Sequence, residues 1–265
     1  MPLHLLQFAK KLAHDAGKLA LHYQKSGVKA QTKRSHTELV TEADRACEEL
    51  IVSSIQKHFP THSIVSEERP AIEGTGEYKW IIDPIDGTTN FAHGLPWFSV
   101  SIAIIHKGKP MIGIVEVPAL GECFWAKHGE GAHLGKHRIA VSTTDELKHS
   151  IGATGFPYER SSARYSKAFE LFEAFYQPGL GVRRSGSAAM DLAYLAAGRL
   201  DFFWEYGLQA WDIAAGKIIV EEAGGLVTNM DGTPLNPKLE NILASNGLVH
   251  NEALAMIKKH GGDKL

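Results

Sequence analysis

The sequence has only two cysteines, Cys47 and Cys123, among its 265 residues, which is too few for a disulfide framework. It has no C-x-x-C pair, and so no sign of a structural zinc or redox site. It also lacks an apolar run of the roughly 18 residues that a membrane-spanning helix requires. The amphipathic N-terminus does not have the continuous apolar stretch of a signal peptide. These absences predict a reduced, cytoplasmic globular protein with no membrane partner.

Neither sign of charge dominates, because the formal net charge is only −2. This balance argues against direct nucleic-acid binding through bulk basic charge. Glycine, in contrast, is abundant: 26 residues, against a usual share of about 7%. We expect one unit over residues 1–265, with an α+β part over about 1–145 and an α/β part over about 146–265. The boundary between the two parts is expected near residues 141–150.

Hydrophobic periodicity predicts a mixture of helices and strands, and hence an α+β fold of layered sheets and helices. Helices are expected at residues 3–24, 41–59, 163–176, 187–197, 212–223 and 249–260. Strands are expected at residues 63–66, 80–82, 98–105, 111–117, 122–126, 151–155, 201–204, 226–229 and 241–245. Those at 98–126 are separated by turn residues and predict an antiparallel meander. His133 and His137 have helical spacing, but the glycine between them favours a turn over a metal site.

The most informative stretch is Asp-Pro-Ile-Asp-Gly-Thr-Thr-Asn-Phe at residues 83–91. Asp83 and Asp86 leave the end of an apolar strand on a turn, followed by Gly87 and the hydroxyl of Thr88. Mg²⁺ prefers carboxylate and carbonyl oxygens, which the two aspartates and the carbonyl of Ile85 supply. The alternative interpretation is a turn that caps a helix and does nothing else.

Other acidic residues also lie at predicted strand ends or helix starts. Glu67 follows the strand at 63–66, Asp212 is expected to cap a helix, and Asp44 forms a capping box with Thr41. Each has a plain alternative as a solvated acid or a simple cap. Together the acids form a set that can converge on one or more cations, which suits phosphoryl chemistry. The sequence contains no P-loop, G-x-S-x-G or H-E-x-x-H motif to support other chemistries.

Two stretches, residues 83–91 and 211–225, resemble the two signatures of the inositol monophosphatase family. Residues 39–44, 66–68, 153–157 and 183–189 also match, the last two especially the bacterial inositol-1-monophosphatase-like members. The resemblance covers nearly the whole chain. It implies a layered αβαβα sandwich of the sugar-phosphatase type, two to three Mg²⁺ ions, sensitivity to lithium and a homodimer.

The resemblance also implies roles for particular residues. The first metal would be held by Glu67, Asp83 and the Ile85 carbonyl, the second by Asp83, Asp86 and Asp212, and a weak third by Glu67. Thr88 and Glu67 would orient the attacking water, with Asp44 hydrogen-bonded to Thr88. The implied substrate-binding residues are Ile85, Asp86, Gly87, Thr88, Arg183, Gly186, Ser187, Ala188, Glu205 and Asp212. Arg183 equally fits a dimer contact, and Lys33 aligns with a loop lysine near the active site but equally fits a solvated residue.

The activity that the resemblance implies is Mg²⁺-dependent hydrolysis of inositol 1-phosphate and related polyol phosphates. Relatives in the superfamily act on fructose bisphosphate, histidinol phosphate, NADP or adenosine bisphosphate, and these stay open as alternatives. A different class of function is also open, because some bacterial members bind the transcription machinery. RNA polymerase is therefore a second expected partner, beside the small phosphate ester.

Overall fold

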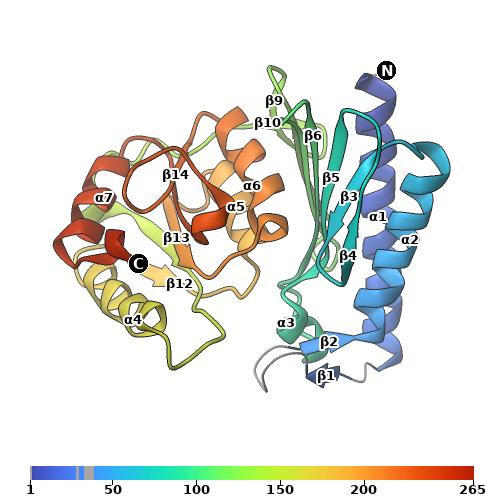
Figure 1. Cartoon of the computed structure of the whole chain (residues 1–265). Helices are drawn as coiled ribbons and strands as arrows, with labels where there is room; N and C mark the ends of the chain where they lie inside the picture. The colour runs from blue at the N-terminus through green and yellow to red at the C-terminus, as the bar shows by residue number, and fades with distance from the viewer. Residues whose placement is uncertain (1, 28–29, 33–38) are drawn as a thin grey trace.

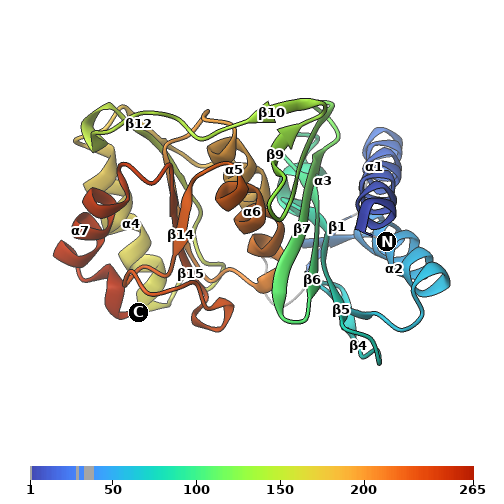
Figure 2. The ribbon, with the colours of Figure 1, turned by 90° about the horizontal axis from the view of Figure 1, so that it is seen from above.

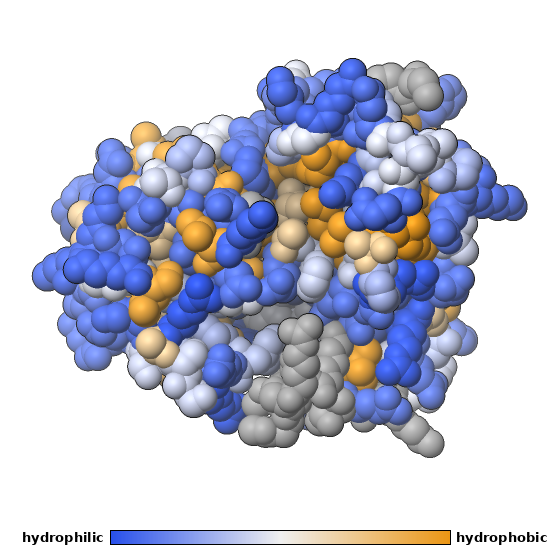
Figure 3. All heavy atoms as spheres, viewed as in Figure 1, coloured by the Kyte–Doolittle hydropathy of each residue, from blue (hydrophilic) through white to orange (hydrophobic). Residues whose placement is uncertain are grey.

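The computed structural model describes residues 2–27, 30–32 and 39–265. Figures 1 and 2 show five layers: helices α1 and α2, a large sheet, helices α5 and α6, a small sheet, and helices α4 and α7. The predicted layered αβαβα sandwich is therefore confirmed. The face seen in Figure 3 is mostly hydrophilic, with apolar residues gathered over the large sheet.

The large sheet has eight strands among the described residues, in the order β10-β9-β8-β7-β6-β5-β3-β4. Only β3 and β5 pair in parallel, and the predicted meander of β6, β7 and β8 is confirmed. The short strand β4 was not predicted. It lies at the edge of the sheet, which is where a strand can contain a proline. The strands are β3 (Ser63–Ser66), β4 (Arg69–Ile72), β5 (Tyr78–Asp86), β6 (Ser99–His106), β7 (Lys109–Val117), β8 (Glu122–Lys127), β9 (Gly131–Leu134) and β10 (His137–Ile139).

The turn that the glycine indicates is present at residues 135–136, but the prediction that His133 and His137 themselves lie in it is wrong. Both belong to strands of a hairpin, in which His137 pairs with Leu134 and His133 with Arg138. The His133 ring stacks on Trp125 of β8 at a centroid distance of 4.2 Å, so cross-strand packing decides its position.

The small sheet has the strand order β12-β11-β13-β15-β14. Its first three strands are parallel, and β13, β15 and β14 are antiparallel. The chain passes from one sheet to the other between Ile139 and Ile151, while the division into two parts stays a prediction. The strands are β11 (Ile151–Thr154), β12 (Gly181–Arg183), β13 (Phe202–Tyr206), β14 (Leu226–Thr228) and β15 (Asn241–Ser245), and a separate pair is β1 (Ala30–Thr32) and β2 (Leu39–Thr41).

The six predicted helices are present, and a short helix, α3, was not predicted. Helix α1 buries one face, as its apolar spacing requires, whereas α5 is apolar nearly all round because it lies between the two sheets. The helices are α1 (Pro2–Ser26), α2 (Glu42–His58), α3 (Thr88–Ala92), α4 (Ala163–Tyr176), α5 (Ala188–Ala196), α6 (Ala210–Glu222) and α7 (His250–Lys259). Short 3₁₀ turns lie at Leu147–His149, Pro237–Leu239 and Gly262–Lys264.

Among the described residues, no helix combines the length and the apolar composition needed to cross a membrane. Both cysteines are unpaired, and Cys47 is buried in the core beneath α1.

Candidate metal centre

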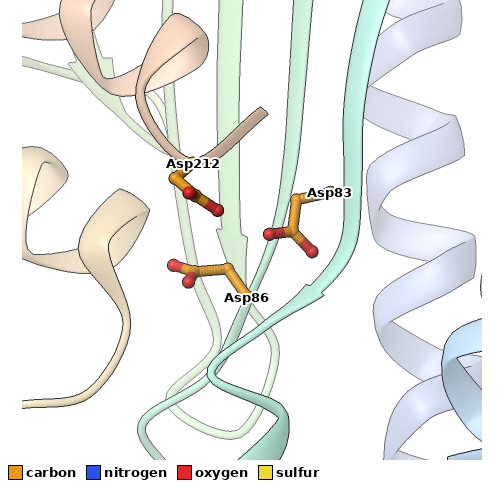
Figure 4. A group of neighbouring side chains, drawn as sticks. All are labelled: Asp83, Asp86 and Asp212. Atoms are coloured by element: carbon orange, nitrogen blue, oxygen red, sulfur yellow. The ribbon is translucent and has the colours of Figure 1, made fainter. Parts of the chain in front are cut away.

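Three carboxylates meet between the large sheet and helix α6 (Figure 4). Asp83 and Asp86 come from the end of β5 and Asp212 from the first turn of α6, and each offers an oxygen within 4.8 Å of the others. Asp83 is only 2% exposed and Asp86 only 8% exposed. Acids buried this deeply and this close together require a counter-charge or protons.

The two aspartates of β5 point to one place because the strand is irregular. The predicted turn at Asp83 is wrong, since β5 continues to Asp86 and pairs with β6 over that length. The register shifts between these aspartates, which is where a bulge re-aims side chains that a regular strand would send to opposite faces. The backbone N–H of Ile85 donates to Asp83 Oδ1 at 3.0 Å, which fixes the first carboxylate.

The carboxylate of Asp86 lies at the start of helix α5. Its Oδ2 accepts hydrogen bonds from Ser187 Oγ at 2.5 Å and from the Ala189 N–H at 2.8 Å. Ser187 is also the N-cap of α5, so one hydroxyl serves both the helix and the site. Ser99 of β6 contributes a longer bond of 3.4 Å to the same oxygen.

Asp212 lies one turn deeper in its helix than predicted. The N-cap of α6 is Gln209, and Asp212 is the third helical residue, whose Oδ2 accepts the Gln209 N–H at 2.6 Å. The capping interpretation is therefore correct in kind and wrong by three positions. The bond uses one oxygen of Asp212, and the carboxylate still lies in the acidic cluster.

Helix α2 brings a fourth acid next to the cluster. Thr41 and Asp44 form the predicted capping box, and Thr88 Oγ1 lies 3.1 Å from Asp44 Oδ1 and 3.0 Å from the Ile85 carbonyl oxygen. The single hydroxyl proton of Thr88 can go to only one of these acceptors, which leaves its lone pairs able to accept from water. Burial raises the pKa of Asp44 to about 6, although its bonds to Thr41 act in the opposite direction.

Gly87 precedes Thr88 and has the left-handed φ of 92° as the N-cap of α3. A Cβ atom there would lie 3.0 Å from the Trp97 carbonyl oxygen and 3.1 Å from that of Gly186. This position therefore requires glycine, which lets three chain segments meet beside the carboxylates.

The electrostatics of the cluster fit a hard divalent cation. Burial raises the pKa of Asp83 well above its ordinary value, and the negative charges of Glu67, Asp86 and Asp212 add to the effect. Burial, and then the charge of Asp86, raise the pKa of Asp212 well above normal. Burial also raises the pKa of Asp86, although the hydrogen bond from Ser187 acts in the opposite direction. Carboxylates and a backbone carbonyl are the ligands that Mg²⁺ prefers. A divalent cation would also supply the positive charge that these buried acids need.

A cavity of about 630 Å³ opens over the cluster and collects most of the predicted residues. A smaller cavity of about 80 Å³ adjoins it. Its wall contains Gly155 and Glu205, and a Cβ on Gly155 would lie 2.1 Å from Glu205 Oε1, so this position has no room for a side chain. The larger is lined by Glu67, Asp83, Ile85, Asp86, Gly87, Thr88 and Asp212, among others. The smaller is lined by Asp86, Gly87, Gly186, Ser187, Ala188, Glu205 and Asp212, among others.

The structure does not bring every predicted residue to the site. Arg183 is the exposed last residue of β12 and lines neither cavity, and Lys33 lies outside the described residues. The sequence reasoning missed Arg184 and Asp191, which both line the smaller cavity. Burial raises the pKa of Asp191 to about 8. The available signal for Asp191 was its spacing of four residues from Ser187, which places both on one face of α5.

A layered αβαβα sandwich with an acidic, oxygen-rich centre between a strand end and helix starts is typical of the metal-dependent sugar phosphatases. The chain belongs to the inositol monophosphatase family, whose sequence profile matches residues 2–261. This is a family of phosphatases that generally depend on metal ions.

Several relatives align over nearly the full chain. A protein named Nus factor SuhB from Pseudomonas aeruginosa is 40% identical over 261 residues, which is 97% of this chain and 96% of that protein. The fructose-1,6-bisphosphatase/inositol-1-monophosphatase of Thermotoga maritima is 39% identical over 254 residues, 96% of each chain. The solved structure of an inositol monophosphatase from Anabaena has a TM-score of 0.87 and 40% identity, and the match covers 97% of this chain and 96% of that one.

Proposed function

We propose that this protein is a Mg²⁺-dependent phosphomonoesterase that hydrolyses inositol 1-phosphate and related polyol phosphates by in-line attack of water on phosphorus. The observation that carries the proposal is the meeting of Asp83, Asp86 and Asp212 within 4.8 Å of one another beside the Thr88–Asp44 pair. Membership of a phosphatase family supports it.

The residues that would hold Mg²⁺ are those of the acidic cluster. Glu67, Asp83 and the carbonyl of Ile85 would hold one ion, Asp83, Asp86 and Asp212 a second, and Glu67 a weakly bound third. Bound Mg²⁺ would supply Lewis acidity, which makes water a better nucleophile at neutral pH and offsets the charge of the leaving oxygen. Without that positive charge the cluster repels a phosphate ester, so metal should bind before substrate.

The chain's own residues would orient the reactants. Thr88 Oγ1, oriented by Asp44, and the carboxylate of Glu67 would accept hydrogen bonds from the attacking water. The backbone N–H groups of Gly87 and Thr88 would donate to the phosphate. The polyol would occupy the smaller cavity, against Gly186, Ser187, Ala188 and Glu205. Burial raises the pKa of Glu205 well above its ordinary value, so this side chain is suited to sharing a proton with a sugar hydroxyl.

A panel of phosphate esters, assayed with Mg²⁺ and with a chelator, tests this proposal. We expect phosphate release to require Mg²⁺ and to be fastest with inositol 1-phosphate. Fructose bisphosphate, histidinol phosphate, NADP and adenosine bisphosphate are the comparison substrates. Release that is unaffected by the chelator would overturn the metal dependence. Faster release from one of the comparison substrates would replace the polyol assignment.

We also propose association with RNA polymerase as a second function, which the names of the SuhB relatives as Nus factors favour. The contact would be between proteins, given the near-neutral charge of the chain. We expect RNA polymerase from the native host to be retained by the wild type and by Asp212→Asn in a pull-down. Retention by neither protein would exclude this function. The homodimer, lithium sensitivity and cytoplasmic location that the resemblance implies stay predictions.

A further inference from the structure

The loop that carries Glu67 is a two-residue β-hairpin turn. Ser66 of β3 pairs with Arg69 of β4, so Glu67 and Glu68 alone connect the strands. Two-residue hairpins favour turns with a positive φ, because those turns match the twist of the strands. Neither glutamate has a positive φ, and the register of β3 and β4 is irregular between Ile64 and Ser66. The loop therefore depends on contacts from outside the hairpin for its conformation.

Glu48 of helix α2 supplies such a contact. Its side chain is only 4% exposed, and its Oε1 accepts the backbone N–H of Glu68 at 3.0 Å. Its Oε2 accepts from Arg69 Nε at 2.8 Å, and Arg69 also bonds the exposed Glu49. A single buried carboxylate thus binds the loop and the first residue of β4 together.

The position of Glu48 on its helix connects this contact to the metal centre. Asp44 lies four residues earlier, so the two acids lie one above the other on the same face of α2. Asp44 bonds Thr88 and Glu48 bonds the loop of Glu67. The two side chains that would orient the attacking water, those of Thr88 and Glu67, therefore both depend on contacts with helix α2 for their positions.

We propose that Glu48 is a positioning residue, which holds Glu67 at the cavity in register with Thr88. The inference rests on the proposed phosphatase function, since it assigns Glu67 to the metal and the water. It adds a contact between Glu48 and the loop, and Glu48 itself would touch neither substrate nor metal. Outer partners of metal ligands typically change metal affinity or activity by about 10- to 100-fold when they are removed.

The test compares Glu48→Ala, Glu48→Gln and two controls. Alanine removes both bonds of Glu48, and we expect kcat at saturating Mg²⁺ to fall and the Mg²⁺ requirement to rise, each by about tenfold or more. Glutamine keeps an acceptor for the Glu68 N–H but loses the acceptor for Arg69 Nε, so it should retain more activity than alanine. Glu49→Ala removes only the outer bond of Arg69, and Ile51→Val loosens the buried face of α2 without touching the loop. Both controls should keep the wild-type kcat and Mg²⁺ requirement.

Calorimetric titration of Mg²⁺ gives a readout that does not depend on turnover. We expect weaker Mg²⁺ binding by Glu48→Ala than by Ile51→Val at matched thermal stability. Equal binding and equal kcat in those two variants would overturn the positioning role. A wild type that binds Mg²⁺ but hydrolyses no ester would instead contradict the proposed function, and the titration would still decide the role of Glu48. If the alanine variant does not fold, Glu48→Asp, whose shorter side chain keeps the charge but not the reach, replaces it.

Discussion

Replacing Asp83 with asparagine should lower Mg²⁺-dependent phosphate release by about a thousandfold or more, which corresponds to about 4 kcal/mol of transition-state stabilisation. Asp83 is the one side chain assigned to both principal metal positions. It lies opposite both Asp86 and Asp212 in the cluster (Figure 4), so its loss would remove the carboxylate that both ions share.

The same substitution should raise the stability of the metal-free protein. Burial and the charges of Glu67, Asp86 and Asp212 raise the pKa of Asp83 well above normal, which means that the folded protein opposes its ionisation. The asparagine oxygen can still accept the Ile85 N–H, but it carries no charge. We expect Tm in EDTA to rise by several degrees, since 1 kcal/mol shifts Tm by about 2–4 °C in chains of 150–250 residues.

Thermal unfolding in EDTA and phosphate release with Mg²⁺ measure the two effects on one preparation. Asp145→Asn is the matched control, because Asp145 is exposed and lines neither cavity of the site. It should change neither quantity. Activity retained by Asp83→Asn would show that the cluster is not the metal centre. A fall in its Tm in EDTA would show that Asp83 has a structural role that its charge does not explain.

Local features of this site were predictable from sequence because their causes are local. The capping box of Thr41 and Asp44 needs only the Thr-x-x-Asp spacing before an apolar helix, and the structure contains it. The meander of β6 to β8 follows from apolar runs separated by turn residues. The capping box depends on neighbours within a few residues, which the sequence displays directly.

Features that depend on distant contacts were not predictable in the same way. The orientation of Asp83 and Asp86 depends on a register shift against β6, and nothing in the sequence fixes that register. The start of α6 was misplaced because Gln209, an uncommon N-cap residue, takes the position that the sequence pattern gave to Asp212. Whether Asp212 meets Asp83 and Asp86 depends on how α6 packs against the large sheet.

Arg183 and Arg184 show how one residue decides which side chain reaches the site. The pair are adjacent: Arg183 is the last residue of β12, and Arg184, the next residue, is the one that lines the cavity. Side chains alternate across a strand, so an error of one position exchanges the two faces. Glu48 was missed for a related reason, because its contact joins α2 to a hairpin whose second strand was not predicted.

Without metal, the protein should become less stable as the pH rises between about 6.5 and 8. Burial raises the pKa of Asp191 to about 8, and it raises those of Asp83 and Asp212 well above normal. A carboxyl whose pKa is higher in the folded than in the unfolded state binds more protons when folded. Its stabilisation is therefore complete below the unfolded pKa and is lost as the pH rises through the folded pKa.

The buried histidine and thiols do not cause a decline in this pH window. His250 has a pKa that burial lowers to about 4, so it stabilises the fold increasingly as the pH rises toward the unfolded pKa of about 6.5, which opposes a decline at the lower end of this window and cannot cause one. Burial raises the thiol pKa of both Cys47 and Cys123, so these groups matter only near and above the ordinary thiol pKa of about 8.5. A decline in Tm between pH 6.5 and 8 can therefore be assigned to the buried acids.

Mg²⁺ should reverse the trend, because it binds the ionised forms of Asp83, Asp86 and Asp212 and not their protonated forms. The Tm difference between Mg²⁺ and EDTA should therefore increase as the pH rises. Asp191→Asn serves as the control, because Asp191 is not an assigned ligand and its loss should flatten the decline in EDTA without removing the Mg²⁺ increment. An increment that is independent of pH would show that Mg²⁺ does not displace protons from these carboxylates. Protons and Mg²⁺ would then not compete for the same carboxylates, and the acidic cluster would not be the metal centre.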